Sequence, residues 1–283
     1  MNPQFAKNWF LRCKQLIDDY NPDLLYFDDE KDLPMEHYGL ELAAHMYNRS
    51  MRMTGGRNEA VITSKRLSEE QQKGVVMDCE RGAFADISPV PWQTCMCIGS
   101  WHYDRRLYER NGYKTAEQIV KTFVDIVSKN GNLLLNIPVR GDGSIDEKEM
   151  AFLAEFKAWI DVNGEGIFGS RPWKIYGEGE VKTTNSSSFG ENERLLASMG
   201  EKEIRFTQKD GTVYAYVLGF PTTDTVVIRA LGRKSEQMNG KKIKKVRMLG
   251  TEKTVTWKQA DDALYITMPD VENTGKAICF SVI

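Results

Sequence analysis

From residue 4 to about residue 175 the chain alternates helical stretches with short apolar runs, and this order constrains the fold most. Residues 4–19 carry apolar side chains at helical spacing, and Pro22 prevents that helix from continuing into the apolar run Leu24–Phe27. The unit recurs, with helices expected at residues 36–53, 115–130 and 146–163 and strands at residues 60–62, 75–77 and 133–135. Strands that alternate with helices predict a parallel sheet of the (β/α) type.

The pattern changes near residue 181. After a polar stretch at residues 183–188, short apolar runs separated by turns cover residues 204–206, 213–218, 225–230, 243–248, 254–257, 264–268 and 277–282. Closely spaced short strands of this kind are typical of an antiparallel β-sandwich. We therefore expect an α/β fold followed by an all-β fold, namely a (β/α) barrel portion over residues 1–178 and a C-terminal β-sandwich domain over residues 179–283.

The stretch before the sandwich is too short for a whole barrel. A complete (β/α)8 (TIM) barrel takes about 250 residues. We therefore expect a partial (β/α)8-like barrel, truncated at its N-terminus, with roughly half of its strand-helix units present. The open edge of such a piece is an aggregation hazard unless it is paired or covered. The missing half is expected upstream or on another chain.

The composition excludes several classes of partner. The chain has 283 residues with 38 Lys and Arg against 40 Asp and Glu, a net charge of -2, which provides no large field for nucleic acid or an anionic membrane. No apolar run approaches the roughly 20 residues of a membrane span, and the first residues lack the pattern of a signal peptide. The five cysteines are scattered without a metal-binding spacing, which favours structural roles: Cys13, Cys79, Cys95, Cys97 and Cys279.

Two acidic residues directly follow short apolar runs. Asp28 ends the run Leu24–Phe27, and Glu80 lies just past residues 75–77. Catalytic side chains of (β/α) barrels lie at the C-terminal ends of strands. In a retaining glycosidase, one carboxylate attacks the anomeric carbon and a second protonates the leaving oxygen and then activates water. Asp28 and Glu80 are the candidate pair, with helix caps or solvated loop residues as the alternative interpretation.

Several segments of the first domain carry a more specific signal. They are YFDD at residues 26–29, PWQT at 91–94, IGSWHY at 98–103, VDIVSKNGNLLLNI at 124–137, DGSI at 142–145 and NGEGIFGSRPW at 163–173. Together, and in this order, they resemble an α-L-fucosidase of glycoside hydrolase family 29, and the expected sandwich resembles that family's C-terminal domain. Residues 128–137 are the most specific part of the resemblance.

The resemblance implies a retaining hydrolase that removes terminal α-L-fucose from glycans without a metal or other cofactor. Asp28, which follows the aromatic pair of Tyr26 and Phe27, would be the nucleophile. The family usually has glycine or another uncharged residue where this chain has Asp29, which keeps Asp29 as the alternative nucleophile. Adjacent side chains of a strand point to opposite faces, so both acids cannot face the sugar. Full-length members are expected to be periplasmic, secreted or lysosomal.

Glu80 falls where the family places its acid/base. That role requires a carboxyl pair about 5–5.5 Å apart. The alternative is that Glu80 and Arg81 form a surface pair of neighbours without a catalytic role.

For sugar binding, the resemblance points to Arg66, with Lys65 as the alternative alignment. Trp101 would stack on the apolar face of fucose, and Tyr26 would line the same pocket. The other interpretation makes both aromatic residues part of the core and leaves Arg66 as an exposed base.

The fucose-binding histidines of the family are absent. Members carry them on early barrel strands, including an adjacent pair, whereas this chain has three histidines and no adjacent two. Two functions follow: an α-L-fucosidase, or a truncated, weak or inactive fragment that serves as a carbohydrate-binding or structural module. A retaining glycosidase for another sugar is a third interpretation. The expected partners are a fucosylated glycan and either a second copy of the chain or a complementing N-terminal barrel half.

Overall fold

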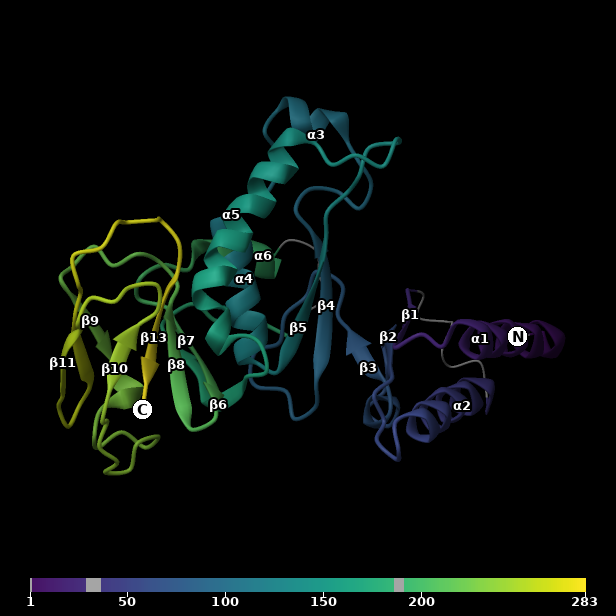
Figure 1. Ribbon diagram of the computed structural model, residues 1–283, viewed down its shortest axis with the longest axis horizontal. Coiled ribbons are helices and arrows are strands. Elements are labelled where there is room, and N and C mark those ends of the chain that lie inside the picture. The colour runs from purple at the N-terminus through teal and green to yellow at the C-terminus, as the bar shows by residue number, and fades with distance from the viewer. Residues whose placement is uncertain (1, 29–36, 186–190) are drawn as a thin grey trace. The chain divides into compact units, whose positions relative to one another are not determined.

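The computed structural model describes residues 2–28, 37–185 and 191–283 of the protein (Figure 1). The chain forms two compact units. The first unit comprises Met1–Glu80 and Val90–Gln93, and the second comprises Arg81–Pro89 and Thr94–Ile283.

The first unit is built from strand-helix repeats, as the sequence predicts. The strand pairs β1–β2, β2–β3 and β3–β4 are all parallel. Asn2 caps the first helix by accepting a hydrogen bond from the Gln4 backbone, and Asn21 ends it in the left-handed conformation. The elements are α1 (Pro3–Tyr20), β1 (Leu24–Phe27), α2 (His37–Met53), β2 (Val61–Lys65), the 3-10 helix η1 (Gln71–Lys73), β3 (Val76–Asp78) and the beginning of β4 (Trp92–Cys97).

Helices α1 and α2 cover one face of these strands. Ile17 of α1 and Leu42 of α2 are fully buried in a core that also contains Ile62 of β2. The rings of Phe10 and Tyr38 stack with centroids 5.5 Å apart, which joins the two helices directly. Apolar residues of β1 and β3 complete this core, so the opposite face of the sheet is left for polar side chains.

The second unit contains the remaining strands of the parallel sheet and two antiparallel sheets (Figure 1). The parallel sheet has the order β1-β2-β3-β4-β5, and the antiparallel sheets have the orders β10-β13-β8-β7-β6 and β11-β12-β9. The helical elements are α3 (Arg105–Glu109), α4 (Ala116–Ser128), α5 (Glu147–Asn163), η2 (Gly164–Gly166), α6 (Glu191–Ser198) and η3 (Arg229–Leu231). The strands are β5 (Gly131–Asn136), β6 (Arg171–Glu178), β7 (Ile204–Lys209), β8 (Thr212–Val217), β9 (Thr225–Ile228), β10 (Val246–Met248), β11 (Thr256–Gln259), β12 (Leu264–Thr267) and β13 (Ile278–Val282). A partial barrel sheet followed by an antiparallel sandwich is confirmed.

Helix α4 lies between the parallel strands and the sandwich. Its Ile119 packs with Met96 of β4, whereas its Val120 and Val124 pack with Tyr216 of β8. Because two faces of this helix are buried, its start has to be well defined. Thr115 and Gln118 form a capping box at this start, which provides that definition.

Four elements that lie wholly or partly in the second unit were not among those expected from the sequence: strands β4 and β6 and helices α3 and α6. Strand β6 contains Pro172, which an edge strand tolerates, and it is the edge of the five-stranded sheet through its pairing with β7. The expected division of the chain at residues 178/179 stays a prediction.

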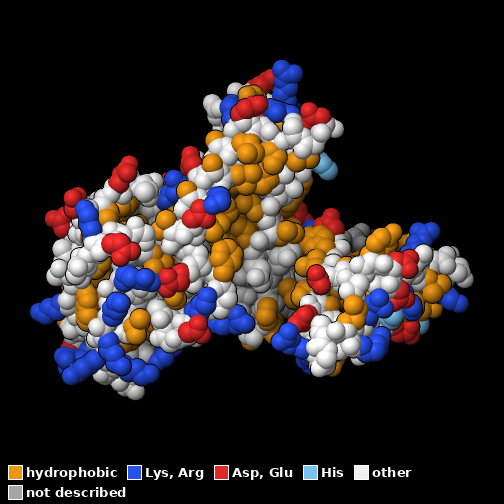
Figure 2. All heavy atoms as spheres, in the orientation of Figure 1, with side chains coloured by type: hydrophobic (Ala, Val, Ile, Leu, Met, Phe, Trp, Pro, Cys, Tyr) orange, Lys and Arg blue, Asp and Glu red, His pale blue; other side chains and the backbone are white. Residues whose placement is uncertain are grey.

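Hydrophobic side chains gather on the surface where β5 and α5 lie (Figure 2). Exposed apolar residues on or next to these elements are Leu134, Val139 and Met150, with 46%, 49% and 52% of their surface accessible. The unbroken apolar run of β5 predicts a strand covered on both faces, and the exposure of Leu134 shows that this is wrong for one face. In the part of the chain that the structure describes, no helix is long and apolar enough to cross a membrane.

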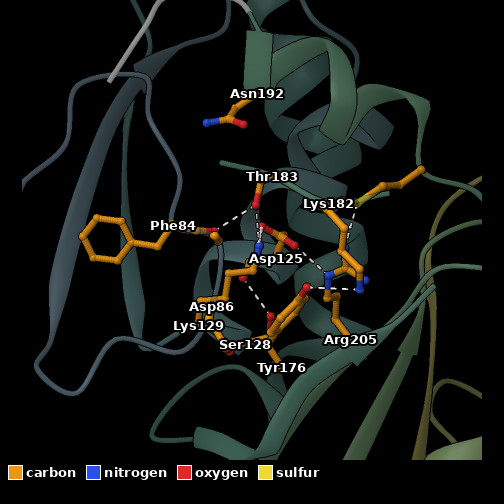
Figure 3. A network of polar contacts seen from close by, with 12 residues as sticks. Phe84, Asp86, Asp125, Ser128, Lys129, Tyr176, Lys182, Thr183, Asn192 and Arg205 are labelled. Atoms are coloured by element: carbon orange, nitrogen blue, oxygen red, sulfur yellow. Dashed lines mark hydrogen bonds and ion pairs between the residues drawn. The ribbon is translucent and has the colours of Figure 1, made fainter. Parts of the chain in front are cut away.

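A network of buried charges holds α4 to the sandwich (Figure 3). Asp125 accepts hydrogen bonds from Lys129 Nζ at 2.7 Å and from Arg205 Nε at 2.6 Å, and all three side chains are at most 1% exposed. Lys129 also donates to the hydroxyl of Thr183 at 2.8 Å. Both cations lie over the ring of Tyr176, at 4.6 and 5.3 Å from its centroid. The network ties together elements that are distant in sequence.

Candidate active site

The face of the parallel sheet opposite α1 and α2 is polar. In the strand register, Tyr26 pairs with Thr63, Lys65 pairs with Asp78, and Asp78 pairs with Gln93. Residues paired in parallel strands, and residues two apart along a strand, point to the same face. These five side chains therefore form one polar surface across β1 to β4.

Asp28 and Glu80 continue this surface just beyond the ends of β1 and β3. Each lies two residues past a member of the polar face, and Lys65 contacts both of them. The Nζ atom of Lys65 is 2.6 Å from Asp28 Oδ1 and 2.5 Å from Glu80 Oε2. The distance between Asp28 Oδ1 and Glu80 Oε2 is therefore at most the sum of these two contact distances. This limit is compatible with the carboxyl spacing of about 5–5.5 Å in retaining glycosidases.

The three charged side chains differ in exposure. Lys65 is 14% exposed and Glu80 is 27% exposed, whereas Asp28 is 78% exposed. A partly buried ammonium that bridges two acids fixes their separation and balances part of their charge. Among the described residues, no group of three or more His, Cys, Asp or Glu is placed to hold a metal ion.

The hydroxyl of Tyr26 lies between two carboxylates. It donates a hydrogen bond to Asp78 Oδ2 at 2.5 Å and lies 3.4 Å from Asp28 Oδ1. Asp78 is 2% exposed, so its charge is nearly removed from water. The short contact belongs to the buried acid and the long one to the exposed acid.

Further hydrogen-bonding capacity is buried on the same face. Thr63 Oγ1, Asp78 Oδ1 and Gln93 Nε2 have no hydrogen-bond partner among the residues that the structure describes. Buried polar atoms are normally paired, because an unpaired one costs about 1–3 kcal/mol. This part of the sheet can therefore accept and donate further hydrogen bonds.

The structure brings together most of the residues predicted for the first unit. Asp28, Glu80 and Tyr26 lie on one face, and Lys65, the alternative to Arg66, contacts both acids. Arg66 follows in the left-handed conformation with φ 51 and is exposed. Asp29, the alternative nucleophile, lies outside the described residues. The catalytic and sugar-binding roles of these residues stay predictions.

Glu80 and Arg81 have different partners. Arg81 has φ 50, and its guanidinium donates to Glu193 at 3.0 Å from Nε and at 2.8 Å from Nη2. Burial alone would raise the pKa of Glu193, but the hydrogen bond from Arg81 and the charge of Lys114 hold that pKa below its ordinary value. The guanidinium of Arg81 is thus bound by Glu193, and the alternative of a surface pair of Glu80 and Arg81 stays a prediction.

Trp101 belongs to the second unit and is half-buried. Its backbone carbonyl accepts a hydrogen bond from Asn136 Nδ2 at 3.2 Å, which attaches its loop to the end of β5. Its role in sugar stacking stays a prediction.

Sequence reasoning missed Asp78 as a member of the polar face. The available signal was its spacing, because Asp78 lies two residues before Glu80, at the end of the apolar run at residues 75–77, and residues two apart along an extended chain share a face. The bridging position of Lys65 depends on the reach of its side chain, which spacing does not reveal.

Comparison with known proteins identifies the family. Residues 1–165 match the family model for alpha-L-fucosidase, and residues 199–280 match the model for the alpha-L-fucosidase C-terminal domain. The chain is 27% identical over 263 residues to the tissue alpha-L-fucosidase of Rattus norvegicus, covering 90% of this chain and 50% of that protein. It is 32% identical over 173 residues to the plasma alpha-L-fucosidase of Homo sapiens, covering 56% of this chain and 34% of that protein.

Solved structures agree with this assignment. The crystal structure of Thermotoga maritima alpha-fucosidase matches with a TM-score of 0.72 at 25% identity, covering all of this chain and 57% of the other. The chain thus spans about half the length of the tissue enzyme of the rat and somewhat more of the bacterial structure. Since the first family model covers more than half of its residues, the chain belongs to the α-L-fucosidase family.

Proposed function

We propose that this chain carries the two catalytic carboxylates of a retaining α-L-fucosidase. Asp28 is the nucleophile and Glu80 is the acid/base. The observation that supports this proposal most is the bridge formed by Lys65, whose Nζ atom lies 2.6 Å from Asp28 Oδ1 and 2.5 Å from Glu80 Oε2. In an inverting enzyme the two carboxyl groups are about 6.5–9.5 Å apart, which leaves room for a water molecule beside the sugar. Two acids held as closely as Asp28 and Glu80 leave no such room.

The reaction proceeds in two displacements. In the first, an oxygen of Asp28 forms a bond to the anomeric carbon of fucose while the glycosidic bond breaks and Glu80 gives its proton to the leaving oxygen. In the second, Glu80 takes a proton from water, and the water oxygen displaces Asp28 from the anomeric carbon.

The proposed substrate is a glycan with a terminal α-L-fucose. Arg66 would donate to a sugar hydroxyl, and Tyr26 and Trp101 would contact the apolar parts of the ring. Solved relatives support this class of ligand, because one of them is the Thermotoga maritima alpha-fucosidase in complex with fucose.

Hydrolysis of an aryl α-L-fucoside by the chain alone tests the proposal. We expect turnover that Asp28→Asn abolishes, with Asp23→Asn as a matched control, because Asp23 is an exposed acid just before the same strand. Glu80→Gln should slow substrates with poor leaving groups more than aryl substrates, since only the former need a proton in the first step. Activity that survives Asp28→Asn contradicts the assignment of the nucleophile.

A second candidate function is a carbohydrate-binding module without turnover. The observation that favours it is the 78% exposure of the Asp28 side chain, because nucleophiles normally act where water is excluded. Calorimetric binding of fucose without hydrolysis of any fucoside would support the module. Cleavage of galactosides or xylosides at comparable rates would instead favour a glycosidase for another sugar.

A partner that supplies further barrel strands, either a second copy or a separate N-terminal half, also belongs to this proposal. Light scattering of the purified chain with and without substrate shows whether two copies associate. Recovery of fucosidase activity after mixing with an N-terminal fragment of a relative shows whether a separate N-terminal half complements the chain.

A further inference from the structure

The hydroxyl of Tyr26 has a single proton and lies near two carboxylates of the residues that the structure describes, those of Asp28 and Asp78. Asp78 Oδ2 lies 2.5 Å from the phenol oxygen, and Asp28 Oδ1 lies 3.4 Å from it. Only the first distance is that of a strong hydrogen bond to a charged acceptor, whereas the second is at the outer limit of hydrogen bonding. The direction of this proton decides whether Asp28 Oδ1 accepts a hydrogen bond from the phenol.

Burial explains why the proton is directed to Asp78. Asp78 is 2% exposed, and its other oxygen has no hydrogen-bond partner among the described residues. The Asp28 side chain is 78% exposed and also contacts Lys65 at 2.6 Å. Water and an ammonium thus stabilise the charge of Asp28, whereas the charge of Asp78 depends on the phenol. Leaving a buried acceptor without its donor costs more than leaving an exposed one.

We propose that Asp78 is a positioning residue that holds the Tyr26 proton away from Asp28. A hydrogen bond that stabilises the negative charge of a nucleophilic carboxylate slows its attack, since that bond is lost as the new ester bond forms. The ammonium of Lys65 already contacts Asp28 Oδ1 and holds this acid near Glu80. By accepting the phenol proton, Asp78 spares the same oxygen a second hydrogen bond. The inference rests on the proposed function of Asp28 as the nucleophile.

Replacement of Asp78 by asparagine tests the direction of the proton. The amide is a neutral and weaker acceptor of similar shape, so the phenol proton is shared with the anionic Asp28. The difference in tyrosinate absorbance between a protein and its Tyr26→Phe counterpart isolates Tyr26 from the other tyrosines of the chain. We expect Tyr26 to ionise at a pH about one unit lower in Asp78→Asn, because the adjacent buried charge is gone. Asp23→Asn, an exposed acid in the same unit, should leave this ionisation unchanged.

A covalent label measures the consequence for Asp28. With 2-fluoro-fucosyl fluoride, an oxygen of Asp28 forms a bond to the anomeric carbon as the carbon-fluorine bond breaks and fluoride leaves, and the adduct is followed by mass spectrometry. We expect Asp78→Asn to slow labelling about tenfold in the wild-type background and less than twofold in the Tyr26→Phe background. A purely structural role for Asp78 would slow both backgrounds alike.

The labelling and the titration test different parts of the proposal. Equal slowing in both backgrounds, or no slowing in either, overturns the positioning role. If 2-fluoro-fucosyl fluoride does not label the wild-type chain, the proposed function of Asp28 as the nucleophile fails. The titration of Tyr26 then tests by itself whether its proton is directed to Asp78. An unchanged ionisation of Tyr26 in folded Asp78→Asn protein overturns the pairing itself.

Discussion

The Nζ atom of Lys65 lies 2.6 Å from Asp28 Oδ1 and is the shared partner through which Asp28 is held close to Glu80. Two acids from different strands would otherwise repel each other at this separation. The single ammonium offsets that repulsion, and its own side chain is held on the sheet because it is only 14% exposed. The polar face of the first unit is therefore organised around a lysine.

Removal of this bridge should impair the site without unfolding the unit. In Lys65→Met, each acid loses a hydrogen bond to a charged group, which is worth about 1.5–3 kcal/mol. We expect kcat/KM for an aryl α-L-fucoside to fall roughly 10- to 100-fold. Lys73→Met is the matched control, because Lys73 is 71% exposed and pairs with Glu70, which is 81% exposed. Equal effects of the two substitutions would contradict an organising role for Lys65.

The buried network of the second unit should contribute strongly to stability. Asp125→Asn removes the carboxylate that the guanidinium of Arg205 and the ammonium of Lys129 both contact, at sites that are at most 1% exposed, and leaves Arg205 with the more distant acid Glu203 at 3.5 Å. Breaking a buried pair in this way costs about 3–5 kcal/mol of unfolding free energy. Asp161→Asn breaks the exposed pair of Lys157 and Asp161, spaced i,i+4 as in Asp125–Lys129, and should cost less than about 0.5 kcal/mol. Urea denaturation followed by circular dichroism compares the two variants.

Asp18 should titrate far below the ordinary range. Hydrogen bonds from Lys14 and His45 lower the pKa of Asp18 from 3.8 to about 2. Because the pKa is lowered in the folded state, this group stabilises the protein above pH 3.8, and the contribution is lost as the pH falls toward about 2. Carbon-13 NMR of the carboxyl groups should show the midpoint of Asp18 moving upward in Lys14→Met and, by less, in His45→Phe. A midpoint near 3.8 in the unmodified protein would show that these contacts do not persist in solution.

The cap of α5 should matter more than the cap of α4. Asp146 accepts hydrogen bonds from the backbone of Lys148 and Glu149 and another from the hydroxyl of Tyr113 at 2.6 Å. Asp146→Ala should therefore cost about 2 kcal/mol, the upper end for a cap, and Thr115→Ala at α4 about 1 kcal/mol. Differences in the urea midpoint at constant slope measure both values. The opposite ranking would mean that the contact with Tyr113 adds nothing.

Local signals predicted much of the fold. Strand β1 occupies Leu24–Phe27 as expected, and the helices expected at residues 115–130 and 146–163 begin at capping boxes, at Thr115 and at Asp146. These features depend on residues within a few positions of one another. Strand β6 depends instead on its pairing with β7, about thirty residues later, and its own sequence with Pro172 gives no local strand signal.

The site was predictable only in part for the same reason. That Asp28 and Glu80 lie near each other follows from the rule that parallel strands end at one edge of a sheet. The pairing of Arg81 with Glu193 could not be foreseen, because Arg81 has a left-handed backbone, with φ 50, and Glu193 is 112 positions away in the sequence. Such a conformation is rare outside glycine and asparagine and has no sequence signature here.

The buried network has a consequence for synthesis on the ribosome. Asp125 and Arg205 are 80 positions apart in the sequence, so α4 emerges long before the guanidinium that binds its aspartate. Until β7 follows, the face of α4 that packs on the sandwich has no sheet to cover it. A nascent chain that stalls in this interval exposes that face to holdase chaperones, and the five-stranded antiparallel sheet is complete only after β13 has paired with β8.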